Sequence, residues 1–309
     1  MDRRAAARRP LSAPEPGLFG PASITWRLDR EAFLLLGAGP RALLMQIAHP
    51  AVAAGVADHS NFRADPWTRL AATLRSYLRI VYGTTDQARA EVHRLNRLHG
   101  GVQGVVPGGG AYHGRDPALA LWVHATLVDS TLTTAHAWLR PLDRQDRARA
   151  YEESVPIGRL FGIAADRLPA DLAAFEDYMT SMLADDGPVQ PGRTAKDLAA
   201  AILSPPAGPA LRTILGSMTD LIPTRLLGPA ESLGDRVPAA ATAWLLWPSI
   251  GLLPPRLREA YGLPWSPLER AVAAWLVASW RAWNAVLPPF VREMPQARAA
   301  DRRIASTMP

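Results

Sequence analysis

The sequence predicts an all-α protein that folds as a single multi-helix domain. Nearly every segment between prolines and glycines carries apolar residues at helical spacing and is rich in Ala, Leu and Arg, which favour helices. Alternating β-branched runs of strand length are scarce. A chain of 309 residues can bury one large core, and neither an internal repeat nor an interdomain linker divides it.

The ends of the chain are predicted to lie outside this domain. We expect a disordered basic tail over residues 1–20, a helical domain over 21–295 and a C-terminal tail over 296–309. The first nine residues hold four arginines and one aspartate, which is half of the net charge of +6. The folded part should therefore be close to neutral, and this distribution argues against nucleic-acid binding.

Cysteine usage and hydropathy exclude further classes. The chain has no cysteine, so it forms no disulfide, zinc–thiolate site or iron–sulfur cluster, and no thiolate can ligate a haem. The N-terminal residues lack the apolar core of a signal peptide. Apolar runs such as 271–280 reach only about half of the roughly 20 residues that span a bilayer. We expect a cytoplasmic protein without a transmembrane segment.

Prolines, glycines and capping residues predict where the first helices begin and end. The apolar stretch over 31–60 should be interrupted at 37–40 and again near Pro50, because proline and glycine weaken helices. Asp65 followed by Pro66 predicts the start of a helix that stops at Gly83.

A second group of signals covers the rest of the chain. Thr84 or Thr85 should cap a helix that ends at 99–101, and the glycine-rich segment over 101–114 predicts a loop. Asp116 followed by Pro117 then opens a long helix. Further helices are predicted over 143–161, 169–185, 193–203, 208–222, 237–252 and 266–286.

His99 is the first candidate for chemistry. It shares one helical face with Val92, Leu95 and Val102, so we expect its imidazole to lie with the buried stripe. A buried imidazole needs a partner, which can be a backbone carbonyl, a neighbouring side chain or a haem iron.

Arg69, Thr73 and Tyr77 follow one another at four-residue spacing in the predicted helix 66–82. An arginine one turn from a hydroxyl can stabilise a bound peroxide or a cofactor carboxylate. The same spacing is also typical of a solvated helix face.

His124 is the main competitor of His99 as an axial ligand, because apolar residues surround it in the sequence. Its alternative role is a hydrogen bond to Asp129 or Glu153.

His49 and His59 are ten residues apart, which is not the i, i+4 spacing of two metal ligands on one helix. We expect His49 to precede a proline kink and His59 to cap or pin the segment before the helix 66–82.

Other motifs lack their partners. The GVVPGGG segment has no GK[ST] and follows a helix, so it is not a phosphate-binding loop. The acidic pairs at 152–153 and 185–186 lack the further ligands of di-iron bundles and of magnesium-dependent helical synthases.

Four phrases in order carry a family resemblance: QIAHPAVAAGVADHSNF, DPWTRLAATLRSYLRIVYG, VHRLNRLHGGVQG, and a tyrosine before the DP-initiated ALALWVHATLVDS. Over about residues 20–185 the chain resembles the MpaB-type oxygenase family, to which the latex-clearing proteins (rubber oxygenases) are related. This resemblance implies an all-helical, partly globin-like fold that holds one non-covalent haem b.

The resemblance also implies roles for individual residues. The proximal histidine of the latex-clearing branch corresponds best to His99 in RLHGGVQG, and the arginine and threonine of its distal R-x-x-K-T motif correspond to Arg69 and Thr73. Ala72 replaces the lysine of that motif, and Lys196 is the only lysine in the chain. A distal lysine on the iron is therefore not expected, and rubber itself is not the expected substrate.

Together these features predict a haem-b-dependent oxygenase or peroxidase-like oxidoreductase. It would use dioxygen or peroxide on a small apolar substrate, such as an isoprenoid or another unsaturated lipid. His99 would hold the iron, with Arg69 and Thr73 on the distal side and Tyr77 and His124 as further cofactor contacts. The alternative is a non-catalytic helical protein that binds a hydrophobic ligand or a protein partner.

Overall fold

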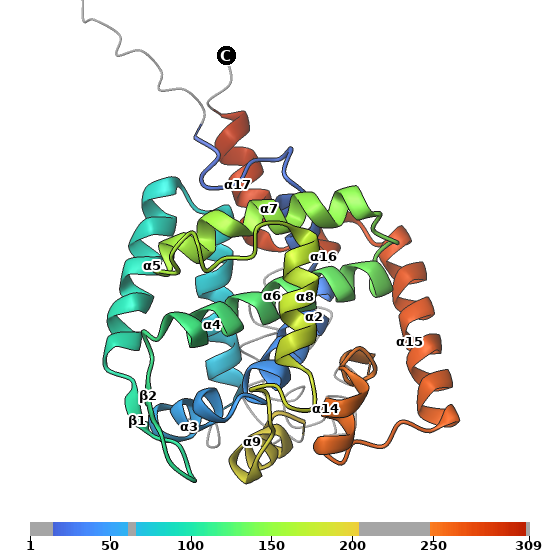
Figure 1. Ribbon diagram of the computed structural model, residues 1–309. Helices are drawn as coiled ribbons and strands as arrows, with labels where there is room; N and C mark the ends of the chain where they lie inside the picture. Colours follow the sequence, from blue (N-terminus) through green and yellow to red (C-terminus); the bar gives the residue numbers. More distant parts are fainter. Residues whose placement is uncertain (1–14, 61–65, 204–247, 307–309) are drawn as a thin grey trace, which may run out of the picture.

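Two long helices that pack against each other at the centre of the molecule, α2 (Ala32–Gln46) and α6 (Pro117–Trp138), organise the fold (Figure 1). The structure is a computed structural model that describes residues 15–60, 66–203 and 248–306. The all-α prediction is confirmed. The other helices are α1 (Ile24–Asp29), α3 (Pro50–His59), α4 (Pro66–Tyr82), α5 (Thr85–Gly100), α7 (Arg144–Leu160), α8 (Leu172–Met182), α9 (Arg193–Leu203), α14 (Pro255–Ala260), α15 (Pro267–Val286), α16 (Pro289–Arg292) and α17 (Pro295–Ala305).

The expected interruption of α2 at 37–40 is wrong, because the helix continues through Pro40. Gly37 serves the packing of α2 on α6 instead: a Cβ at this position would overlap the ring of the buried Trp138. Four residues further on, the buried Arg41 donates hydrogen bonds to Asp129 at 2.6 Å and to Ser130 at 2.8 Å, both on α6. Close contact and a buried ion pair thus fix the two helices together.

The interruption predicted near Pro50 is confirmed. Helices α2 and α3 meet at an angle of 105°, and His49 caps α3 by accepting a hydrogen bond on Nδ1 from the amide of Ala51 at 3.2 Å. Among the described residues, no single helix has the length and apolar composition of a membrane span. The bent α2–α3 pair meets those criteria only when both helices are counted together.

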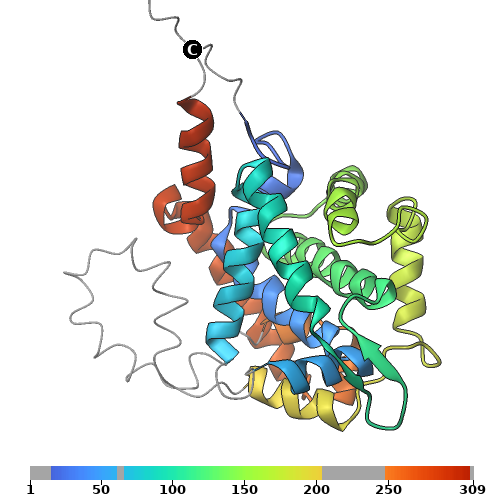
Figure 2. The same ribbon diagram turned by 90° about the vertical axis from the view of Figure 1, so that its left-hand side faces the viewer.

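Helices α4 and α5 form an antiparallel pair (Figure 2). Gly83 ends α4, and Thr84 begins α5 with a capping box in which its hydroxyl accepts from the Gln87 amide while the Gln87 side chain accepts from the Thr84 amide. This boundary was predicted from the sequence. The predicted cap at Asp65 lies outside the described residues.

The segment predicted as a loop over 101–114 contains a β-hairpin of β1 (Gln103–Val105) and β2 (Ala111–His113), with Gly104 opposite Tyr112. Its turn runs through Gly108, Gly109 and Gly110, which all have positive φ.

Two contacts hold this hairpin on α3. The Tyr112 hydroxyl donates to Asp58 at 2.6 Å, and His59 Nε2 lies 2.9 Å from the Gln103 carbonyl oxygen. His59 therefore pins the hairpin, and the segment before α4 that it was expected to cap or pin lies outside the described residues.

The segment expected as a C-terminal tail over 296–309 is helical as far as Ala305, and Ala297, Ala300 and Ile304 are buried. Helix α17 contacts α4. Near the other end, the side chain of Phe19 is buried too, so the predicted N-terminal tail does not extend to residue 20.

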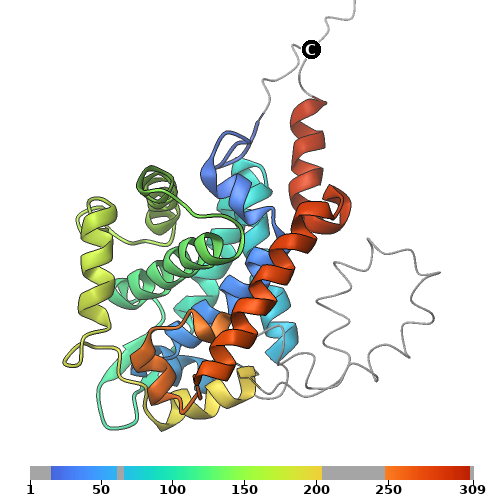
Figure 3. The same cartoon turned by 90° about the vertical axis from the view of Figure 1, so that its right-hand side faces the viewer.

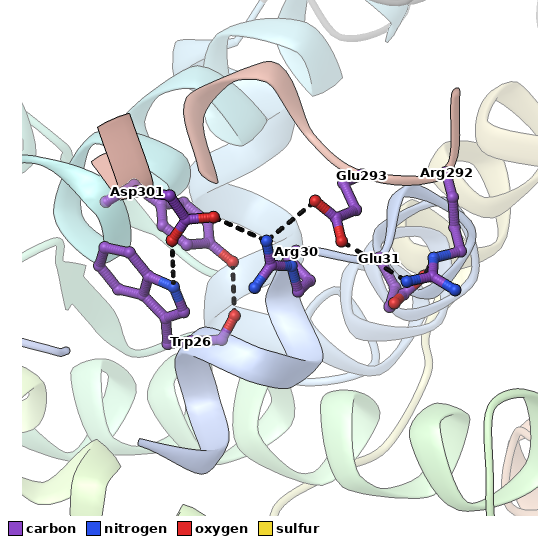
Figure 4. A network of polar contacts seen from close by, with 7 residues as sticks. Trp26, Arg30, Glu31, Arg292, Glu293 and Asp301 are labelled. Carbon is purple, nitrogen blue, oxygen red and sulfur yellow. Dashed lines mark hydrogen bonds and ion pairs between the residues drawn. The ribbon is translucent and has the colours of Figure 1, made fainter. Parts of the chain in front are cut away.

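A polar network joins α1 to this C-terminal segment (Figure 4). Arg30 Nη2 binds Glu293 at 2.9 Å and Asp301 at 2.7 Å, and the Trp26 indole donates to Asp301 at 3.3 Å. These long-range contacts stabilise α17 in a way that no local sequence signal shows. Two predicted helices lie outside the described residues: the one at 208–222 entirely, and the one at 237–252 as far as residue 247.

Replacing Gly37 with alanine tests the close packing of α2 on α6. The new methyl group would collide with Trp138, so we expect Gly37→Ala to lower the free energy of unfolding by about 1–3 kcal/mol, measured by urea denaturation. Gly192→Ala is the control, because nothing lies within 4 Å of a Cβ there. Equal unfolding curves for the two variants would contradict the packing described above.

Candidate functional site

Arg69 and His99 come together at the end of the α4–α5 pair that lies away from the Gly83 turn. Arg69 is exposed near the start of α4, and His99 is only partly buried near the end of α5. Burial lowers the pKa of His99, and the positive charge of Arg69 lowers it further. The ring of His99 makes no hydrogen bond within the part of the chain that the structure describes. This end of the pair is a cationic, accessible site.

Thr73 and Tyr77 do not join this site as one strip. The exposed Thr73 uses its hydroxyl to donate to the Arg69 carbonyl at 3.0 Å, within its own helix. The Tyr77 hydroxyl donates to Asp29 of α1 at 2.6 Å. Each of the three residues spaced along α4 thus has a different surrounding.

The Asp29–Tyr77 pair is a buried acid and phenol. Asp29 has no exposed surface, and its Oδ1 has no hydrogen-bond partner among the described residues. Burial raises the pKa of Asp29 to about 7, although the hydrogen bond from Tyr77 opposes this shift; the charge of Glu153 adds to it. Sequence reasoning missed Asp29, because its neighbours in TWRLDREA are charged and typical of a solvated turn.

His124 is the most deeply buried histidine of the described chain. It lies on α6 and is 9% exposed, and burial lowers the pKa of its imidazole to about 4. Its Nε2 atom has no hydrogen-bond partner among the residues that the structure describes. The ring is therefore neutral at physiological pH and has an unsatisfied nitrogen.

The two acceptors that the sequence offered to His124 are occupied elsewhere. Asp129 pairs with Arg41, and Glu153 accepts from the amides of Ile24 and Thr25 at 3.0 and 2.8 Å, where it caps the start of α1. The alternative role of His124 as a hydrogen-bond donor to either carboxylate is therefore wrong.

The surroundings of His124 are apolar. A Cβ at Gly158 of α7 would lie 3.4 Å from His124 Nε2 and 2.9 Å from Leu168 Cδ2. Leu121, Ile163 and Leu168 form a buried cluster beside these helices. A neutral imidazole nitrogen in a dry environment is the donor chemistry of a single axial haem ligand.

His49 is a weaker candidate. It is partly buried, and its Nδ1 already caps α3. Burial lowers its pKa, and the charge of Asp116 opposes this.

The described residues contain no group of three or more His, Asp or Glu side chains arranged to hold a metal ion by themselves. A haem differs from such a site, because its porphyrin supplies four ligands and the protein needs to add one.

The sequence that forms these helices matches a known protein family. The family model described as "ER-bound oxygenase mpaB/B'/Rubber oxygenase, catalytic domain" matches residues 26–303. The chain belongs to this family. The match runs from α1 to α17, so the mpaB/rubber oxygenase family includes the C-terminal helices as well as the N-terminal motifs.

Two curated mycobacterial proteins are similar to this mpaB/rubber oxygenase family member: uncharacterized protein Rv2237 of Mycobacterium tuberculosis and uncharacterized protein Mb2261 of Mycobacterium bovis. Each is 24% identical over 251 residues, which cover 80% of this chain and 87% of the relative. No solved structure matches the chain.

The effect of the Arg69 charge on His99 is tested by replacing the arginine. Because the positive charge disfavours protonation of the imidazole, Arg69→Gln should raise the pKa of His99, measured by NMR titration of the ring protons. Arg75→Gln, an exposed change on the same helix, is the control. An unchanged pKa in Arg69→Gln would show that the charge of Arg69 does not act on His99.

The buried carboxyl of Asp29 predicts a dependence of stability on pH. Its folded-state pKa of about 7 exceeds the usual 3.8, so the folded protein holds this proton more tightly and loses stability as pH rises between these values. Asp29→Asn should therefore be more stable than the unaltered protein at pH 8, by at most about 4 kcal/mol for about three pKa units, and nearly equal to it at pH 4.

Urea unfolding at several pH values measures this difference, and Asp166→Asn, at an exposed loop position, is the control. If the curves for Asp29→Asn and the unaltered protein run parallel at all pH values, Asp29 is not the buried acid described above.

Proposed function

We propose that this protein is a haem-b-dependent oxygenase that acts on a small apolar substrate of isoprenoid or lipid type. Membership of an oxygenase family supports the reaction class. The observation that carries the haem assignment is the buried, unpartnered Nε2 of His124.

By the chemistry of its nitrogen, His124 would suit haem iron better than His99, which the resemblance had favoured, although Gly158 encloses Nε2 and α7 would have to move for a porphyrin to reach that atom. A nitrogen ligand must be neutral and must have a free lone pair, and burial keeps the His124 ring neutral. An unsatisfied buried nitrogen costs about 1–3 kcal/mol in the empty protein, and coordination of iron removes that cost. His99 is only partly buried and lies beside a cation.

Arg69 and His99 together suit a carboxylate. Arginine binds carboxylates through two parallel hydrogen bonds, and the side chain of Arg69 is exposed. We assign this pair to a carboxylate of the cofactor or to an oxygen-derived anion at the same end of α4.

Bound haem supplies a redox-active iron that activates dioxygen or peroxide. The residues of this chain set the conditions around it. The hydroxyl of Thr73 already donates to the Arg69 carbonyl, so it can accept a hydrogen bond from a ligand but must break the 3.0 Å bond to donate one. Nε2 of His124 has no hydrogen-bond partner among the described residues, so no bond to the protein would compete with a ligand for this atom.

The latex-clearing branch has a lysine in its R-x-x-K-T motif, and this chain has Ala72 at that position. The single lysine of the chain, Lys196, is exposed on α9. No lysine of this chain can therefore serve as a resting distal ligand from the α4 motif. Arg69 and Thr73 would then be the polar side chains that this motif offers to a bound cofactor. The apolar cluster beside His124 supports a substrate without charge.

Haem titration of the purified protein tests the proposal. Hemin added to the apoprotein should give a Soret band and a dithionite-reduced spectrum of a histidine-ligated haem b. His124→Ala should weaken haem retention at least tenfold, and His124→Gly should recover the spectrum when imidazole is added. His93→Ala, at an exposed position of α5, is the control and should bind haem normally.

The two histidine assignments and the non-catalytic alternative give different results. If His124→Ala binds haem normally and His99→Ala does not bind it, His99 is the iron ligand instead. A protein that binds no haem but retains a fluorescent fatty acid would be a hydrophobic-ligand carrier.

A further inference from the structure

Two tyrosines of α4 donate hydrogen bonds to α1. Helix α1 packs on α4 and α7 and lies next to α17 (Figures 2 and 3). The hydroxyl of Tyr77 donates to Oδ2 of Asp29 at 2.6 Å. The hydroxyl of Tyr82 donates to the carbonyl oxygen of Trp26, one turn earlier on α1, at 2.9 Å. The two phenols therefore lie in one interface but have acceptors of different chemistry.

This interface is largely closed to solvent. Asp29, Trp26 and Tyr82 are buried, and Tyr77 is partly buried and packs against the same apolar cluster. Burial raises the pKa of Tyr77, and the charge of Asp29 raises it further. The phenol therefore keeps its proton at physiological pH. It can lose an electron without leaving a buried positive charge only if the proton leaves as well.

The acceptors of the two phenols differ in what they can do with that proton. A carboxylate can take a proton, whereas a peptide carbonyl only accepts the hydrogen bond. When Tyr77 loses an electron, its proton can move along the 2.6 Å bond to Asp29. A neutral phenoxyl radical and a neutral carboxylic acid result, so the buried charge of Asp29 disappears. Oxidation of Tyr82 would leave a buried cation instead, which is costly.

A second tyrosine–carboxylate pair joins the hairpin to α3. The hydroxyl of Tyr112 donates to Asp58 at 2.6 Å. Asp58 is exposed, so water already stabilises its charge and exchanges with any proton that it takes. Oxidation of Tyr112 removes no buried charge. The arrangement at Tyr77 therefore favours oxidation more strongly.

Aromatic rings continue from this interface toward the surface (Figure 4). The rings of Trp26 and Tyr82 meet edge-on, with their centroids 4.8 Å apart. The Trp26 indole donates at 3.3 Å to Asp301, whose side chain is 37% exposed. This contact gives an electron a route between the apolar cluster around Tyr77 and the surface.

We propose that Tyr77 is a redox-active tyrosine and that Asp29 is its proton acceptor. One electron leaves the phenol for an oxidant, the O–H bond of Tyr77 breaks, and a new O–H bond forms on Oδ2 of Asp29. The natural oxidant is the bound cofactor after reaction with peroxide, and this part rests on the proposed function. The pair thus supplies an electron to the cofactor from within the protein.

Flash photo-oxidation of the purified chain tests the pair without haem. A tris(bipyridine)ruthenium complex with persulfate withdraws one electron, and electron paramagnetic resonance of protein labelled with ring-deuterated tyrosine identifies a phenoxyl radical. Tyr77→Phe should lower the yield of long-lived radical at least fivefold. Tyr82→Phe and Tyr112→Phe are the controls and should retain it. Loss in Tyr112→Phe together with retention in Tyr77→Phe would overturn the proposal.

Replacing Asp29 with asparagine separates proton transfer from a structural hydrogen bond. The amide oxygen of asparagine can accept the hydrogen bond of Tyr77 but does not take its proton. We therefore expect Asp29→Asn to lose the radical as Tyr77→Phe does, although the phenol is still present. Asp58→Asn is the matched control, and circular dichroism checks that each variant is folded. A full radical yield in Asp29→Asn would show that Asp29 is not the proton acceptor.

The proton step also predicts a pH profile. Among the described residues, the titratable groups that act on Asp29 are Tyr77 of α4 and Glu153 of α7. Only ionised Asp29 can take the proton, and its pKa is about 7, so the radical yield should rise as pH increases through this value. Asp29→Asn should abolish the rise. A yield that does not change with pH in the unaltered protein would contradict the proposal.

Peroxide treatment of the hemin-loaded protein tests the natural oxidant. It should give the same radical, and Tyr77→Phe should abolish it. If hemin binds and peroxide gives no radical at Tyr77, the cofactor is not the oxidant and the proposal is overturned. If no hemin binds, the proposed function fails, while the photo-oxidation still decides whether Tyr77 and Asp29 act as a redox pair.

Discussion

The unsatisfied nitrogen of His124 is the constraint on which the functional account depends. It arises from how the neighbouring helices are fixed. Arg41 of α2 pairs with Asp129, and the first amides of α1 donate to Glu153, so both carboxylates already have partners other than the imidazole. Close packing at Gly37 and Gly158 brings α2 and α7 to α6 and limits relaxation of the ring. Most buried polar atoms in folded proteins have a partner, and a bound ligand is one explanation for an atom that has none.

Local signals predicted much of the fold. Thr84 with Gln87, and Asp116 with Pro117, begin helices through hydrogen bonds and dihedral angles that involve only neighbouring residues, and the structure has both boundaries. The predictions were wrong where contacts between residues far apart in the sequence determine the structure. Helix α2 continues through Gly37, where Trp138 packs closely against the helix. Helix α17 is stabilised by the ion pair of Asp301 with Arg30 and by contacts with α4.

The site could be predicted only in part for the same reason. The turn at Gly83 implies that the start of α4 meets the end of α5, so Arg69 and His99 could be paired from the sequence. The unpartnered Nε2 of His124 depends on which carboxylates are already paired, and the surroundings of Asp29 depend on a tyrosine 48 residues away. Spacing along a helix cannot show either fact. The sequence resemblance named the family correctly, whereas the burial of His124 could be known only from the structure.

Helix α6 joins several parts of the core. Its first half presents His124 to α7, and its last residue, Trp138, packs on Trp280 of α15. The most direct test of the central claim is anomalous diffraction at the iron absorption edge from crystals of the haem-loaded protein. The account predicts one iron peak within coordination distance of a ring nitrogen of His124. An iron peak beside His99, or haem bound with no contact to His124, would contradict it.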